Sequence, residues 1–188
     1  MPRESGRREA LAERATDYVL EHGIAGLSLR PLAAALDTSD RMLVYHFGSK
    51  DALVAGVIER ANDRSVAALQ AMRAARSPRA AVSALWRAWQ RPVIARCLRV
   101  YAQSAALGLL GDEPYLSAAR RSNEVWGEAV ADFMMRSGAP AGRAIRVGEL
   151  VDATLFGLFL DQPVDAGARH IDLVIRDLAD AVQRISDA

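Results

Sequence analysis

Cysteine, metal-ligand clusters, long apolar runs and strand patterns are scarce or missing in this sequence of 188 residues. A single cysteine, Cys97, excludes an internal disulfide and any multi-cysteine zinc site. No run of about 18 apolar residues suggests a membrane span, and the first residues lack the apolar core of a signal peptide. We therefore expect a cytoplasmic protein with no metal and no other cofactor.

Motifs of known enzyme chemistry are missing as well. The three histidines, His22, His46 and His170, are far apart in the sequence and form no metal-binding spacing. Neither a glycine-rich phosphate loop nor a nucleophile elbow is present. Cys97 lies among apolar residues of a helical segment, which favours a buried, inert thiol. We expect no enzymatic activity, and an active site assembled only in three dimensions ranks last among the alternatives.

The charge is balanced overall and uneven along the chain. Apolar residues make up 51% and charged residues 25%, which indicates a folded globular chain, and the formal net charge is +1. Residues 60–121 carry eleven Arg and three acids, whereas residues 122–188 carry six Arg and eleven acids. Either the two segments neutralise each other locally, or the basic segment holds an anionic ligand or partner.

The apolar periodicity is helical almost everywhere, and alanine, the strongest helix former, is abundant. Sustained apolar/polar alternation and hairpin turns are not found. We expect an all-α fold of about nine helices, with Ser28, Ser39, Ser49 and Ser77 as N-caps and a loop at Pro163–Gly167. The helices are expected at about 6–22, 28–36, 39–47, 49–75, 77–90, 92–110, 114–138, 140–160 and 171–185.

The second and third helices are short and separated by a tight break, which is typical of a helix-turn-helix. Their apolar positions would face inward, namely Leu32, Ala33, Leu36, Leu43 and Phe47. In a helix-turn-helix the outward face of the second of the two helices reads base edges. Here that face would carry Asp40, Arg41, Val44 and Tyr45, with Met42 at its edge. Many helical proteins contain short tandem helices, so this pattern alone is not specific.

The run from Leu43 to Leu53, Leu-Val-Tyr-His-Phe-Gly-Ser-Lys-Asp-Ala-Leu, makes the pattern specific. Together with Ser28-Leu29-Arg30, it resembles the N-terminal domain of the tetracycline-repressor (TetR) family of transcriptional regulators, over residues 8–58. The resemblance implies a three-helix DNA-binding domain at residues 1–50. A ligand-binding and dimerisation domain at residues 51–188 would be linked to it through the helix at 51–75.

The resemblance also implies which residues contact DNA. Ser28, Arg30 and Lys50 match positions that contact phosphates or begin the second helix. The recognition helix would contribute Ser39, Asp40, Arg41, Met42, Val44, Tyr45 and His46. Two positions depart from the family pattern. Asp37 replaces the usual glycine, which implies a different turn or a left-handed Asp, and the usual tyrosine position holds Val44, with Tyr45 one place later.

Physical arguments keep alternatives open at three of these residues. Lys50 begins a helix, where the macrodipole disfavours a cation, so it either binds a phosphate there or is a solvated lysine. Arg41 either bonds guanine O6 and N7 or lies on a phosphate or in solvent. Asp40 either caps its helix or accepts a hydrogen bond from cytosine N4.

Aromatic and methionine side chains of the C-terminal part suggest a small apolar or aromatic effector, although such residues are more often core. The candidate ligand contacts are Trp86, Trp89, Tyr101, Trp126, Met134 and Phe156. By family analogy the last two helices would form a homodimer. Ala153 and Gly157 would allow close approach, although the apolar stripe of the last helix could instead complete the monomer core.

The sequence thus predicts a ligand-responsive transcriptional regulator, a repressor in the first instance. It would bind a palindromic operator in double-stranded DNA as a homodimer and be released by its effector. The alternative is a helical small-molecule-binding or adaptor protein whose helix-turn-helix does not read DNA. Asp37, Asp40 and the zero net charge of residues 1–50 support that alternative.

Overall fold

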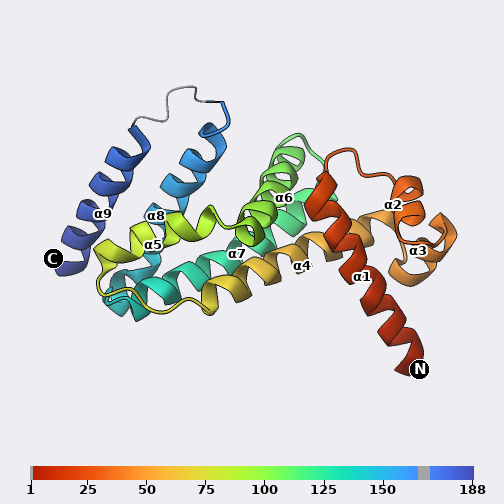
Figure 1. Cartoon of the computed structure of the whole chain (residues 1–188), viewed down its shortest axis with the longest axis horizontal. Coiled ribbons are helices and arrows are strands. Elements are labelled where there is room, and N and C mark those ends of the chain that lie inside the picture. The colour runs from red at the N-terminus through yellow and green to blue at the C-terminus, as the bar shows by residue number, and fades with distance from the viewer. Residues whose placement is uncertain (1, 165–169) are drawn as a thin grey trace. The chain divides into compact units, whose positions relative to one another are not determined.

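A computed structural model describes residues 2–164 and 170–188, with side chains from Gly6 onward. Within these residues all regular structure is helical, which confirms the predicted all-α fold (Figure 1). The helices are α1 (Pro2–His22), α2 (Leu29–Ala35), α3 (Asp40–Phe47), α4 (Lys50–Gln70), α5 (Pro78–Trp89), α6 (Pro92–Leu109), α7 (Glu113–Arg136), α8 (Ala141–Asp161) and α9 (Ile171–Asp187). Residues 165–167 of the loop expected at Pro163–Gly167 lie outside the described residues.

The end of α4 differs from the sequence prediction, which continued this helix to about residue 75. The helix ends at Gln70, although the residues that follow have good helix propensity. Two side chains, from the last residue of α7 and from the residue after it, form hydrogen bonds with the main chain that follows Gln70. Arg136 donates to the carbonyl oxygen of Met72 at 2.9 Å, and the N–H of Ala75 donates to Ser137 Oγ at 3.0 Å. These tertiary hydrogen bonds replace the ones that another helical turn would make.

The chain forms two compact units. The first unit consists of residues 1–65 and 93–124, and the second of residues 66–92 and 125–188. Thus the beginning of α7 and nearly all of α6 pack with the N-terminal helices. The functional division near residue 50 that the sequence suggests is a division by role and stays a prediction.

The core of the first unit fixes the short helices α2 and α3. Helices of seven and eight residues are too short to be stable alone, so they depend on burial of their apolar faces. Leu32 of α2 and Leu43 of α3 are fully buried in one cluster with Leu53 of α4. Burial of one such leucine contributes about 2 kcal/mol. Cys97 and Tyr115, from α6 and α7, belong to the same cluster.

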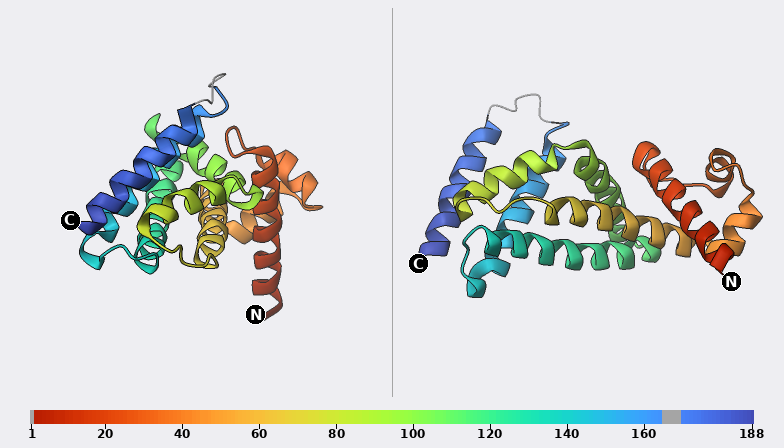
Figure 2. Two further views of the ribbon diagram at one scale, coloured as in Figure 1. Left: turned by 60° about the vertical axis from the view of Figure 1, so that its left-hand side comes forward. Right: turned by 60° about the horizontal axis from the view of Figure 1, so that its bottom comes forward.

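In the second unit, α9 packs against both α5 and α8 (Figure 2). Its buried stripe includes Ile175, Leu178 and Val182, so this face completes the core of the chain itself. Gly148 on α8 lies against the backbone of α7, where a Cβ would be 3.4 Å from Ala131 Cα. Among the described residues, no helix combines the length and the hydropathy that a membrane span requires.

Candidate nucleic-acid interface and ligand cluster

Helix α3 has well-defined ends. Ser39 caps its start, because the N–H of Met42 donates to Ser39 Oγ at 3.3 Å. Gly48 ends it with a positive φ of 86°, and the N–H of Gly48 donates to the Val44 carbonyl at 2.7 Å. Leu43, with 0% of its surface exposed, anchors the helix to the core. The expected helix over residues 39–47 is therefore present and fixed along one face.

The opposite face of α3 carries the side chains expected there. Asp40, Arg41, Val44 and Tyr45 are exposed, and Tyr45 is 67% exposed. Met42 is partly buried, as expected for an edge position. This face therefore offers a cation, an aromatic ring and an apolar side chain to a partner.

His46 lies differently from the other recognition-helix candidates. Its side chain is partly buried, and its Nε2 is buried without a hydrogen-bond partner among the described residues. The ring of Tyr45 packs edge-on against that of His46, with centroids 5.2 Å apart. The ring of His46 therefore packs against that of Tyr45 and contributes little to the exposed face of α3.

Asp37 forms the tight turn between α2 and α3. Its φ is 53°, so the left-handed aspartate is the form adopted of the two that the sequence left open. Arg14 of α1 donates to Asp37 Oδ2 at 3.0 Å and to the carbonyl oxygen of Ala35 at 3.3 Å. Because both side chains are exposed, the ion pair contributes less than about 1 kcal/mol. Its effect is to hold the turn in one orientation.

The residues expected to contact phosphates lie on the surface of the first unit. Lys50 is exposed at the first position of α4, whose start is capped by Ser49: the N–H of Ala52 donates to Ser49 Oγ at 3.0 Å. Arg30 is exposed in the first turn of α2. Ser28 occupies the N-cap position of α2, but its side chain makes no cap hydrogen bond. That hydroxyl therefore stays available for another acceptor or donor.

A network of ion pairs joins α1 to α4. Arg60 bonds Glu9 at 2.8 Å and Glu13 at 2.9 Å. Arg64 bonds Asp17 at 2.6 Å and also pairs with Glu13. Both arginines are only about a quarter exposed, at 26% and 27%, so solvent screens the network less than it would a surface pair. The network fixes the direction of α1 along α4.

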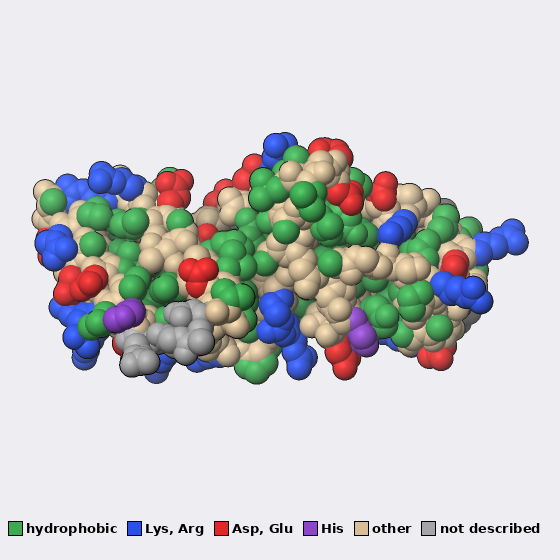
Figure 3. All heavy atoms as spheres, turned by 90° about the horizontal axis from the view of Figure 1, so that it is seen from above, with side chains coloured by type: hydrophobic (Ala, Val, Ile, Leu, Met, Phe, Trp, Pro, Cys, Tyr) green, Lys and Arg blue, Asp and Glu red, His purple; other side chains and the backbone are tan. Residues whose placement is uncertain are grey.

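The charges of the basic segment 60–121 are partly neutralised by nearby acids. Besides Arg60 and Arg64, Arg121 pairs with Glu59 at 2.7 Å and Arg79 with Asp180 at 2.8 Å. On the face drawn in Figure 3, cationic and acidic side chains are interspersed. Among these pairs only that of Arg79 joins segment 60–121 to segment 122–188, as one interpretation of the sequence expected. The acids that neutralise Arg60, Arg64 and Arg121 lie in residues 9–59 instead.

Three of the six candidate ligand contacts lie together in the second unit. The ring of Trp89 on α5 contacts Trp126 of α7 and Phe156 of α8, with centroids 6.0 and 6.5 Å apart. Phe159 joins them at 6.2 Å. All three pairs meet edge to face, an attractive arrangement of ring quadrupoles. We call Trp89, Trp126, Phe156 and Phe159 the aromatic cluster.

The other three candidates do not join this cluster. Trp86 lines a groove between α5 and α9. Met134 is fully buried. Tyr101 belongs to the first unit, where its hydroxyl and Asn123 Oδ1 are 3.1 Å apart.

Asp152 is a polar member of this region that the sequence did not reveal. Its carboxylate accepts a hydrogen bond from Trp126 Nε1 at 2.6 Å. Burial raises the pKa of Asp152, and the hydrogen bond from Trp126 lowers it only in part. Trp89 Nε1 is buried and has no partner among the described residues. The spacing of Asp152, Phe156 and Phe159 on one helical face was the available signal.

Chemistry based on thiols or metals finds no support in the described residues. Cys97 is buried, and desolvation raises the pKa of its thiol to about 11. Its thiolate is therefore scarce at neutral pH, as expected for an inert side chain. No group of three or more potential metal ligands occurs among the described residues.

The N-terminal helices are similar to those of one known family. Residues 11–57 match the family model described as bacterial regulatory proteins, tetR family. No curated protein matches the chain.

Several solved structures share the fold over nearly the whole chain. A protein assigned to the TetR family of transcriptional regulators, from Rhodococcus sp., is 21% identical with a TM-score of 0.67, covering 97% of this chain and 99% of its own. The multidrug binding protein EbrR, complexed with imidazole, is 21% identical with a TM-score of 0.66, covering 99% of this chain and 94% of its own. A protein assigned to the same family from Mesorhizobium loti is 16% identical with a TM-score of 0.60, covering 97% and 95%.

Proposed function

We propose that this chain, which carries a tetR-family N-terminal domain within the fold of TetR-family transcriptional regulators, is a ligand-responsive transcriptional repressor. It binds a palindromic operator in double-stranded DNA as a homodimer and releases it when a small effector binds. Residues 1–50 read the DNA, and residues 51–188 bind the effector and form the dimer. The chain performs this role in the cytoplasm and without enzymatic activity.

The single observation that carries the proposal is the outward face of α3. A helix anchored by Leu43 presents Arg41, Val44 and Tyr45 to solvent, and this is the geometry with which such a helix enters a major groove. Arg41 is our candidate for base reading, because a guanidinium can bond O6 and N7 of one guanine together. Asp40 stands in the first turn, where a carboxylate favours the helix start.

Phosphate contacts come from the helix starts on either side of α3. Lys50 lies at the start of α4, where the helix dipole favours an anion although Ser49 already caps the N–H of Ala52. A phosphate there is bound by the lysine and the helix terminus together. Arg30 and the unbonded hydroxyl of Ser28 play the same part at the start of α2. Phosphate contacts at the starts of α2 and α4 together set the angle at which α3 enters the groove.

Dimerisation uses α8 and α9. The surface of α8 exposes the small residues Ala153 and Gly157, and larger apolar side chains beside them are exposed too: Leu150 at 39% and Leu160 at 46%. Small residues let two helices approach closely, and the apolar neighbours would be removed from water by a second copy. A two-fold dimer places two copies of α3 on successive half-sites.

The effector contacts the aromatic cluster. Its rings are apolar, with Trp89 and Trp126 buried and Phe156 and Phe159 partly exposed. Trp89 Nε1 and Asp152 provide a donor and an acceptor that lack full hydrogen bonding within the described residues. An aromatic ligand with one or two polar groups can bond both the Trp89 donor and the Asp152 acceptor. It releases DNA if it binds more tightly to a dimer whose recognition helices no longer fit successive grooves.

Selection of bound sequences from a random pool of duplex DNA tests the proposal. The expected result is an inverted repeat whose half-sites are about ten base pairs apart or a multiple of that. An Arg41→Ala variant should relax the preference at one position in each half-site, with Arg73→Ala, at an exposed position between α4 and α5, as the control. A chain that binds small aromatic molecules but selects no sequence would be the helical binding or adaptor protein instead.

A further inference from the structure

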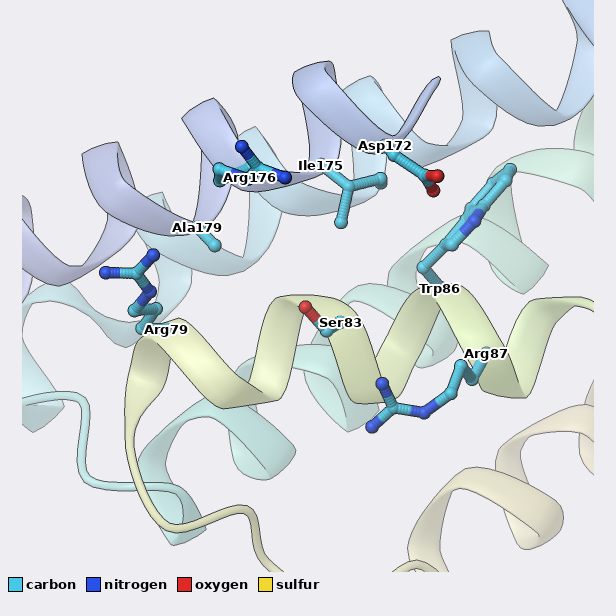
Figure 4. A pocket seen from close by; sticks show the side chains of 8 residues that line it. All are labelled: Arg79, Ser83, Trp86, Arg87, Asp172, Ile175, Arg176 and Ala179. Carbon is cyan, nitrogen blue, oxygen red and sulfur yellow. The ribbon is translucent and has the colours of Figure 1, made fainter. Parts of the chain in front are cut away.

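A groove of about 390 Å³ lies between α5 and α9 in the second unit (Figure 4). This volume falls within the range of small-molecule sites, about 300 to 1,000 Å³. One stripe of each helix lines it: Arg79, Ser83 and Arg87 follow one another along α5 at four-residue spacing. The groove shares no lining residue with the aromatic cluster around Trp89.

The charges in this groove are not balanced. Arg79 is held by Asp180, at 2.8 Å. Arg87 of α5 and Arg176 of α9 are both exposed and form no ion pair with a described residue. Asp172 is the one acid among the lining residues and lies toward the Trp86 end in Figure 4. Figure 4 draws Arg79 and Arg176 on the other side of Ser83 from Trp86, and it draws Arg87 on the side of α5 turned away from α9. Because Asp180 holds Arg79, the unbalanced positive charge on that side of Ser83 is that of Arg176.

Ser83 adds a hydroxyl that makes no hydrogen bond with a described residue. Other helical hydroxyls of this chain bond back to the carbonyl four residues earlier, for example Ser104 to Val100 and Ser186 to Val182, each at 2.8 Å. Ser83 makes no such bond with a described residue, and Figure 4 shows its hydroxyl directed toward α9. This hydroxyl is therefore available to a ligand in the groove.

The rest of the lining is apolar. Ile175 and Ala179 of α9 are 7% and 3% exposed and form a floor. The indole of Trp86 is partly buried and stands at one end, on the same side as Asp172 (Figure 4). An aromatic ring lying on this floor would stack against or meet the edge of Trp86.

We propose that this groove is a second small-molecule site, which binds an aromatic carboxylate. The carboxylate is held by Arg176 of α9, with a hydrogen bond from Ser83 of α5. Guanidinium and carboxylate match in geometry and can form two parallel hydrogen bonds. The aromatic body covers Ile175 and reaches Trp86, where Asp172 can accept a hydrogen bond from a donor on the ligand.

Calorimetric titration of the full chain, without DNA, tests the site. The probes are 2-naphthoate, its uncharged isostere 2-naphthamide, and the cation 2-naphthylmethylammonium. We expect 2-naphthoate to bind and the amide and the cation to bind at least ~10-fold more weakly, since they lack the charge-assisted bonds. Arg176→Gln should weaken 2-naphthoate by a similar factor of ~10. Arg184→Gln, an exposed arginine of the same helix outside the groove, should leave it unchanged.

Two further variants place the site. Ser83→Ala should weaken 2-naphthoate by a factor of ~3 to 10, the effect of one hydrogen bond. Trp86→Phe should remove the ligand-induced change in tryptophan fluorescence. Equal binding of naphthoate and naphthamide, or full affinity in the Arg176→Gln variant with an unchanged melting temperature, would overturn the proposal. So would the absence of any binding of naphthoate.

Discussion

The side-chain carbonyl oxygen of Gln103 on α6 accepts a hydrogen bond from the main-chain N–H of Ile24 at 2.7 Å. It also accepts one from the N–H of Ala25 at 3.1 Å. Ile24 is fully buried, and Gly23 beside it has a φ of 86° and lies so close that a Cβ there would be 2.9 Å from Gln103 Oε1. One side chain of α6 thus holds the segment that connects α1 to α2.

Replacement of Gln103 by leucine should loosen this segment. Two N–H groups lose their acceptor, one of them on a buried residue, which costs about 1 to 2 kcal/mol of unfolding free energy. Operator affinity should fall, but its salt dependence should not change, because no phosphate contact is removed. Gln103→Glu keeps an acceptor and should restore most of the affinity. Hydrogen exchange at Ile24 is the direct measurement, and unchanged protection in the leucine variant would refute the coupling.

Lys50→Ala should weaken binding to all DNA sequences alike. If the lysine neutralises one phosphate, the slope of log K against log salt should decrease in magnitude by about 0.9. Gel shifts on operator and on random DNA at several salt concentrations give this slope. Arg73→Ala, at an exposed position between α4 and α5, serves as a control for the loss of one positive charge. An unchanged slope would mean that Lys50 is a solvated lysine.

What could be predicted from the sequence was mostly local. The recognition helix follows from the Ser39 cap, the Gly48 stop and the inward position of Leu43, all within ten residues of one another. Gln103 and Asp152 could not be identified in this way, because each acquires its role from a residue more than twenty positions away, Ile24 and Trp126. The early end of α4 has the same cause, since the hydrogen bonds that replace its last turn come from α7 and the residue after it.

The turn at Asp37 makes a test of backbone strain possible. A residue with a φ of 53° is in the left-handed region, which costs an L side chain other than glycine about 1 kcal/mol. Asp37→Ala loses the Arg14 ion pair and keeps the strain, whereas Asp37→Gly loses the ion pair and relieves it. We expect the glycine variant to be more stable than the alanine variant by about 1 kcal/mol in urea unfolding. Equal stabilities would mean that the turn relaxes when its side chain is removed.

The buried carboxylate of Asp152 should make the stability of the chain depend on pH. Burial raises the pKa of this group in the folded chain above its ordinary value. The charged carboxylate therefore destabilises the folded state at neutral pH, and this destabilisation is lost as the pH falls through the raised pKa. Asp152→Asn keeps an oxygen that can accept from Trp126 Nε1 but carries no charge. We expect this variant to be more stable than the parent by about 1 kcal/mol at pH 7, with a smaller difference at pH 4, because the parent carboxyl takes up a proton as the pH falls through its raised pKa. Urea unfolding at both pH values measures it, with Asp177→Asn as the exposed control on α9. A variant less stable than its parent at pH 7 would mean that the charged hydrogen bond to Trp126 outweighs the cost of burial.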